Sequence, residues 1–124
     1  IGVGIDFTAR DLQRECKKEG KPWDIAKAFD GSAVLGKFIK KEKLPDPGAI
    51  DFQLDLNGQT VQKGNTRVLI FSFETIIAYV SKFITLKTGD LIYTGTPAGV
   101  GPVKINDHLV ASVEGQVMLD FMVK

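Results

Sequence analysis

Asp6 is the carboxylate whose position in this sequence most suggests chemistry. It directly follows the short apolar run Ile1–Ile5 and precedes Thr8 and Asp11, which open a predicted helix. A carboxylate at the end of a strand can bind a hard cation such as Mg²⁺ or Mn²⁺, which also needs one or two further carboxylates. It can equally be one more acid near a helix N-terminus, and the bare spacing favours this simpler role. The spacing identifies no partner carboxylate for a metal.

Lys27 is the second candidate, because it lies in an otherwise apolar stretch between Pro22 and Phe29. The simpler interpretation, which its residue type favours, is that the stem packs on apolar surface while the ammonium group reaches solvent. The functional alternative is an ammonium group held close to a bound cation, where it would stabilise the negative charge of an enolate.

A glycine-rich loop, Gly95–Gly101, suggests the binding of an anion. It lacks the Lys-Ser or Lys-Thr pair of a P-loop, and Lys104 stands where the dinucleotide-binding fingerprint needs its third glycine. A nucleotide site is therefore disfavoured. Exposed backbone N–H groups in such a loop can still bind a small oxyanion or carboxylate.

Single residues exclude several other kinds of site. Cys16 is the only cysteine and His108 the only histidine, so there is no intrachain disulfide, paired-cysteine zinc site or two-histidine motif. We expect Cys16 not to be a nucleophile, and His108 to be incidental and without a partner. Sixteen basic against fifteen acidic residues give a net charge of +1, which argues against a nucleic-acid partner. The apolar runs are too short to span a membrane, and a lone thiol without a visible signal peptide predicts a cytoplasmic protein.

The 124 residues have the length of one domain, and helices must position some of these candidates. The Thr8 hydroxyl is predicted to cap a helix that runs to about Glu19 and ends at Gly20. A short helical turn is predicted within Trp23–Phe29. Ser72 is predicted to cap another helix, whose apolar stripe should pack into the core. That stripe consists of Phe73, Ile76, Ile77, Val80, Phe83 and Ile84.

Strands outnumber helices. Alternating apolar residues between Ile50 and Leu56, followed by Asn57-Gly58, predict a hairpin that returns along Gln59–Lys63. A second hairpin is predicted around Glu114-Gly115, from Leu109–Val113 to Val117–Val123. Further strands are expected at Ile1–Ile5, within Gly31–Ile39, and at Leu91–Thr94. The pattern predicts an α+β fold that is mainly β, with antiparallel pairing.

Three stretches together resemble one protein family. They are Gly4–Gln13 (GIDFTARDLQ), Lys21–Asp30 (KPWDIAKAFD) and Gly89–Pro102 (GDLIYTGTPAGVGP). Their order and spacing resemble the fumarylacetoacetate hydrolase family, above all its small members. These include acylpyruvases, oxaloacetate decarboxylases and isomerase/decarboxylases of homoprotocatechuate breakdown, an aromatic catabolic route. The similarity spans nearly the whole chain.

The resemblance implies a mixed β-roll or sandwich with flanking helices, a homodimer, and one Mg²⁺ or Mn²⁺ per site. By the matching motif positions, Asp6 is a metal ligand, and Lys27 is the lysine near the metal. Arg10 and Gln13 line the substrate pocket, and Thr96 contacts the substrate carboxylate. The implied substrate is a small 2-oxo or 2,4-dioxo acid, cleaved or isomerised through an enolate bound to the metal.

The departure from the family pattern is large. The family's other two metal carboxylates, a Glu-x-Glu, and its lid histidine and glutamate come upstream of the position of Asp6, and none is found here. His108 does not match the lid histidine. We therefore expect residues 1–124 to form an incomplete catalytic domain without its N-terminal part, inactive alone. Hydrolase, decarboxylase and isomerase activities stay open, and so does a non-catalytic carboxylate-binding or interaction module.

Overall fold

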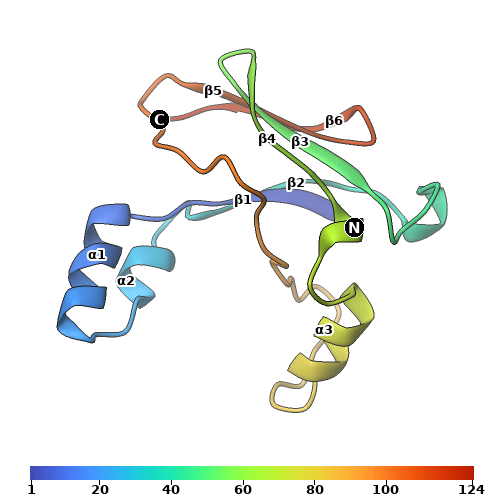
Figure 1. Cartoon of the computed structure of the whole chain (residues 1–124), viewed down its shortest axis with the longest axis horizontal. Helices are drawn as coiled ribbons and strands as arrows, with labels where there is room; N and C mark the ends of the chain where they lie inside the picture. Colours follow the sequence, from blue (N-terminus) through green and yellow to red (C-terminus); the bar gives the residue numbers. More distant parts are fainter.

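Four antiparallel strands form the larger of two sheets, in the order β4-β3-β5-β6 (Figure 1). The smaller sheet pairs β1 with β2, also antiparallel. The computed structural model describes residues 1–124. The strands are β1 (Gly2–Asp6), β2 (Ala33–Phe38), β3 (Asp51–Leu56), β4 (Gln59–Asn65), β5 (His108–Val113) and β6 (Gln116–Met122). The helices are α1 (Arg10–Glu19), α2 (Asp24–Lys27), α3 (Phe73–Val80) and the short 3-10 turns η1 (Lys41–Lys43) and η2 (Thr66–Val68).

Both predicted hairpins are confirmed. Asn57 and Gly58 have φ angles of 51° and 79°, so the turn between β3 and β4 has the positive φ values that suit the twist of a two-residue hairpin. Glu114 and Gly115, with φ angles of 49° and 73°, play the same part between β5 and β6. The two turns fix the register of the β3–β4 pair and of the β5–β6 pair.

The two sheets pack closely against each other, and β5 contributes three of the ten buried residues. Leu109, Ala111 and Val113 alternate on its inner face. A Cβ atom on Gly36 of β2 would lie 2.8 Å from the Met118 carbonyl oxygen of β6, so only glycine allows this approach. The mainly β, α+β class predicted from the sequence is confirmed.

The first helix forms as predicted, except at its start. Gly20 ends α1 in the left-handed conformation with φ 65°. However, the residue that precedes α1 is Ala9, and no side chain caps the helix, so the predicted role of Thr8 is wrong. The Thr8 hydroxyl instead accepts a hydrogen bond from Lys27, at the end of α2.

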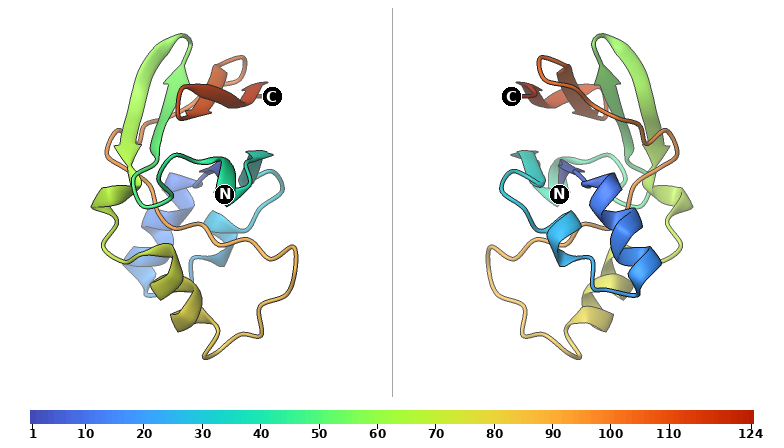
Figure 2. Two further views of the ribbon diagram at one scale, coloured as in Figure 1. Left: turned by 90° about the vertical axis from the view of Figure 1, so that its right-hand side faces the viewer. Right: turned by 90° about the vertical axis from the view of Figure 1, so that its left-hand side faces the viewer.

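The third helix is capped as predicted, since the Ser72 hydroxyl accepts from the backbone N–H of Thr75. Its apolar stripe packs against the core only at its start, where the half-buried Phe73 lies against the core cluster, so the prediction is wrong for the rest of the stripe. No residue of α3 is buried, and Ile77, Phe83 and Ile84 are 50%, 74% and 60% exposed. Figure 2 shows that α3 extends away from both sheets.

The segment Leu91–Thr94 is not a strand, contrary to prediction. Its backbone pairs with neither sheet, and its one attachment to β2 is made by a side chain, the Tyr93 hydroxyl. This segment is therefore a loop without strand pairing. None of the helices combines the length and apolar character that crossing a membrane requires.

Replacing Leu109 with alanine should lower the free energy of unfolding by about 2–5 kcal/mol, because the side chain is only 1% exposed and would leave a cavity. Val117→Ala on β6, where the side chain is 53% exposed, should cost less than about 1 kcal/mol. Urea denaturation measures both. Equal losses would contradict this location of the core.

Candidate functional site

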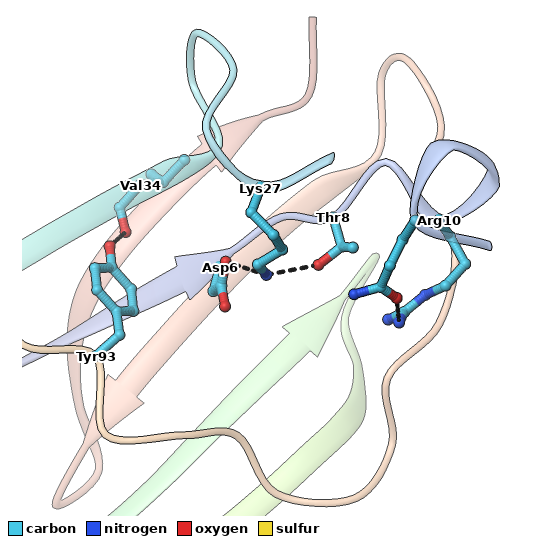
Figure 3. A network of polar contacts seen from close by, with 7 residues as sticks. Asp6, Thr8, Arg10, Lys27, Val34 and Tyr93 are labelled. Carbon is cyan, nitrogen blue, oxygen red and sulfur yellow. Dashed lines mark hydrogen bonds and ion pairs between the residues drawn. The ribbon is translucent and has the colours of Figure 1, made fainter. Parts of the chain in front are cut away.

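Lys27 and Asp6 lie in direct contact. The Lys27 Nζ is 2.6 Å from Asp6 Oδ1 and 2.8 Å from Thr8 Oγ1, so one ammonium group joins the end of β1 to the segment before α1 (Figure 3). The side chains of Lys27 and Asp6 are 33% and 47% exposed, so the group is open to a ligand. The simpler interpretations of both residues are corrected, because Asp6 does not cap α1 and Lys27 does not merely extend into solvent.

Backbone hydrogen bonds explain why these side chains meet. The N–H of Phe7 donates to the Ser32 carbonyl at 2.7 Å, and the N–H of Ala9 donates to the Ala26 carbonyl at 3.0 Å. The residues after β1 are therefore held against α2 and against the turn that leads to β2. Ala26 is completely buried, which leaves Lys27 at the surface end of α2 facing Asp6.

Arg10 and Gln13 contact each other, as neighbours on one face of α1. The Arg10 Nη1 donates to Gln13 Oε1 at 2.7 Å. Gln13 is 7% exposed, whereas Arg10 is at the surface, on the same side of the network as Thr8 (Figure 3). The buried amide fixes the direction of the guanidinium group, which has further N–H groups for a ligand carboxylate.

Thr96 lies apart from the other four predicted site residues and contacts none of them. These four are Asp6, Arg10, Gln13 and Lys27. Its Oγ1 accepts a hydrogen bond of 2.9 Å from the Gln62 Nε2 on β4. Gln62 was not predicted as a site residue, because Gln62 and Thr96 are 34 positions apart and no local sequence pattern links them.

Tyr93 connects the loop to the Asp6 network. Its hydroxyl donates to the Val34 carbonyl at 3.0 Å, and a Cβ atom on Gly4 would lie 2.8 Å from that hydroxyl. Burial, followed by the negative charge of Asp6, raises the pKa of Tyr93. Thr96 is three residues further along, within about 11 Å of chain reach.

The residues of this chain can supply one ligand to a hard cation but do not complete a metal site. Asp6 Oδ1 bonds to Lys27, while its Oδ2 accepts no hydrogen bond, so an anionic oxygen is available. No group of three or more His, Cys, Asp or Glu side chains in residues 1–124 could hold a metal ion. Mg²⁺ is often bound through one or two carboxylates together with water and substrate oxygens. Asp6 fits as one of these ligands.

His108 and Cys16 take no part in this network. The His108 Nε2 lies 2.7 Å from Asp120 Oδ1, across β5 and β6, so the prediction that it has no partner is wrong. Cys16 is 3% exposed within α1, in keeping with its exclusion as a nucleophile.

Comparison with known proteins gives one consistent result. A family model described as "Fumarylacetoacetate (FAA) hydrolase C-terminal" matches residues 1–124. The mitochondrial oxaloacetate tautomerase of Mus musculus is 53% identical over 120 residues, which is 97% of this chain and 54% of that protein. The chain thus spans about half the length of this curated relative.

Solved structures agree with this match. A fumarylacetoacetate hydrolase family protein from Yersinia pestis is 41% identical with a TM-score of 0.93, over 99% of this chain and 58% of that one. Fumarylpyruvate hydrolase from Pseudomonas aeruginosa, solved in complex with Mn²⁺ and pyruvate, is 34% identical with a TM-score of 0.87, over 99% and 54%. The fold and the relatives' enzyme names point to the same family as the sequence motifs.

The raised pKa of Tyr93 predicts a loss of stability in strong alkali. The folded protein holds the phenolic proton more tightly than the unfolded chain, so this contribution is complete below about pH 10, the unfolded pKa, and is lost as the pH rises through the folded pKa. Tyr93→Phe should remove that part of the pH dependence. Urea denaturation between pH 8 and 11 measures it, and unchanged slopes in the variant would contradict the prediction.

Proposed function

The chain belongs to the fumarylacetoacetate hydrolase family, and from this we propose that it forms part of a metal-dependent enzyme acting on small 2-oxo acids. The observation that carries the proposal is the contact between Lys27 and Asp6, with Thr8 as second acceptor. It holds a cation-binding carboxylate beside a fixed positive charge. This pairing suits a reaction in which a substrate oxygen becomes negative.

Lys27 is the residue that we propose to meet this developing charge. An ammonium group has three N–H donors, and two of them point at Asp6 and Thr8. The third is free to donate to a substrate carbonyl oxygen. Because both acceptors fix its position, little reorganisation is needed as charge accumulates on that oxygen.

A Mg²⁺ or Mn²⁺ ion held by Asp6, together with ligands from outside residues 1–124, would supply Lewis-acid polarisation of the 2-oxo group. Arg10 and Thr96 would orient the substrate through its carboxylates, with Gln13 fixing the direction of Arg10. The proposed assignments of Asp6, Lys27, Arg10, Gln13 and Thr96 are those that the family resemblance implies.

Oxaloacetate is the proposed substrate, and its keto–enol tautomerisation the proposed reaction. The support is the name of the relative at 53% identity. In that reaction a proton leaves the carbon next to the 2-oxo group, and negative charge develops on the oxygen that Lys27 would face. The proton acceptor is not assigned to any residue of this chain.

Cleavage of an acylpyruvate is the second candidate. It is supported by the name of the fumarylpyruvate hydrolase at 34% identity, whose structure contains Mn²⁺ and pyruvate. Breaking the carbon–carbon bond also leaves negative charge on the 2-oxo oxygen, so the same residues would serve. Assays with oxaloacetate and with an acylpyruvate separate the two activities. Measuring the release of CO₂ from oxaloacetate detects decarboxylation.

The homodimer and the cytoplasmic location stay predictions. The exposed apolar face of α3 is compatible with a dimer contact, and light scattering on the full-length protein would measure the oligomeric state. A non-catalytic carboxylate-binding module remains the alternative. It predicts binding of pyruvate without turnover of oxaloacetate or any acylpyruvate.

Asp6→Asn in the full-length protein should weaken Mn²⁺ binding by at least about tenfold, because a neutral amide is a poorer ligand for a hard cation than a carboxylate. Isothermal titration calorimetry with Mn²⁺ measures this effect. Asp11→Asn is the matched control, since Asp11 is an exposed acid in the first turn of α1. Undiminished Mn²⁺ binding by the Asp6 variant would refute the ligand assignment.

Lys27→Met should reduce kcat for oxaloacetate by about 100-fold or more, because it removes the positive charge facing the substrate oxygen. Lys27→Arg should recover only part of the rate, since a planar guanidinium cannot reproduce the ammonium geometry. Steady-state kinetics at saturating Mn²⁺ measures kcat. If Lys27→Met retained full kcat, Lys27 would have no catalytic part.

A further inference from the structure

Gln62 attaches the glycine-rich loop to β4 with both hydrogens of its side-chain amide. Its Nε2 lies 2.9 Å from Thr96 Oγ1 and 2.9 Å from the Pro97 carbonyl oxygen. A second attachment lies beside it, where Gly99 passes so close to β4 that a Cβ atom would be 2.0 Å from the Val61 carbonyl oxygen. Gly99 also has a φ of 101°, which disfavours any other residue. The loop is therefore seated on two successive residues of one strand.

These contacts fix the direction of each hydrogen bond. A carbonyl oxygen can only accept, so the Pro97 contact requires that the NH₂ end of the Gln62 amide faces the loop. Thr96 Oγ1, which contacts the same nitrogen, must then be the acceptor. A hydroxyl that accepts a bond still has its own proton to donate.

The proton of the Thr96 hydroxyl has no acceptor within the protein. Thr96 is at the surface, and Gln62 is the partner of its hydroxyl. The proton is therefore free to be donated to a ligand oxygen outside the protein. Such a bond to a carboxylate is charge-assisted and stronger than one to a neutral oxygen.

We propose that Gln62 is a positioning residue that keeps the Thr96 hydroxyl as a hydrogen-bond donor toward the substrate carboxylate. The proposal rests on the function proposed above, in which Thr96 contacts that carboxylate. Gln62 itself does not touch the substrate. Because its amide offers Thr96 only an N–H donor, the Thr96 hydroxyl has no acceptor within the protein. The hydroxyl proton is left for a ligand oxygen, and a carboxylate oxygen accepts it most strongly.

The test uses the full-length protein at saturating Mn²⁺ and compares the binding of pyruvate with that of its neutral analogue pyruvamide. Gln62→Leu should weaken pyruvate binding by about tenfold or more, and pyruvamide binding by only about threefold, since bonds to charged acceptors contribute more. Thr96→Val should show the same preference. The double variant should bind pyruvate no worse than Thr96→Val, because Gln62 acts through the hydroxyl.

Two further variants keep the test decisive. In Gln62→Glu, the carboxylate can accept the Thr96 proton but cannot donate to Pro97, so this variant of nearly equal size should also lose pyruvate binding. Gln53→Leu is the matched control. Gln53 lies in the same hairpin and its Nε2 donates to Asp55 and Thr60, at 2.8 and 3.0 Å, away from the loop. It should leave pyruvate binding unchanged.

The outcomes separate this inference from the proposed function. If Thr96→Val weakens pyruvate binding but both Gln62 variants bind normally, Gln62 has no positioning role, while the function of Thr96 stands. Fully additive losses in the double variant, or equal losses for pyruvate and pyruvamide, would also overturn the inference. If Thr96→Val itself binds pyruvate normally, the proposed contact with the carboxylate fails first.

Discussion

The hydrogen-bonded ion pair between Lys27 and Asp6 organises the rest of the candidate site. Both side chains are partly exposed, so water screens their attraction and the pair contributes little to stability. Its consequence is geometric: the ammonium group is fixed by two acceptors, Asp6 and Thr8, and the end of β1 is fixed relative to α2. Without this contact, Lys27 would be a mobile surface cation and Asp6 an isolated acid.

The loop around Thr96 reaches this network by a different route. Tyr93 ties the chain to β2 close to Asp6, and Gln62 ties it to β4 three residues later. Because the segment between them forms no ladder, side chains determine its path. The site therefore has two parts, a charged pair at the end of β1 and a loop with a hydroxyl free to donate, each positioned by hydrogen bonds between distant segments.

Local sequence patterns predicted the elements whose conformation is determined by a few neighbouring residues. The hairpin at Asn57-Gly58 needs positive φ angles over two residues, and the helix stop at Gly20 needs one, so both are visible in the sequence. The site was not visible in this way. Lys27 and Asp6 are 21 residues apart, and their contact depends on tertiary hydrogen bonds at Phe7 and Ala9. The family resemblance supplied the roles of these residues, while the residues alone favoured simpler ones.

The errors also have physical causes. Thr8 has the right type to cap a helix, but the Lys27 ammonium group competes for its hydroxyl. The stripe on α3 has helical spacing, yet most of it is exposed within residues 1–124, which span about half the length of the relative in Mus musculus.

A crystal structure of the full-length protein with Mn²⁺ and pyruvate would test the central role of the Lys27–Asp6 contact most directly. The predicted result is Asp6 as a metal ligand, with Lys27 Nζ still within hydrogen-bond distance of Asp6 and Thr8 and its third N–H directed at a pyruvate oxygen. If Lys27 turned to solvent, or the metal were bound without Asp6, this contact would not organise the site.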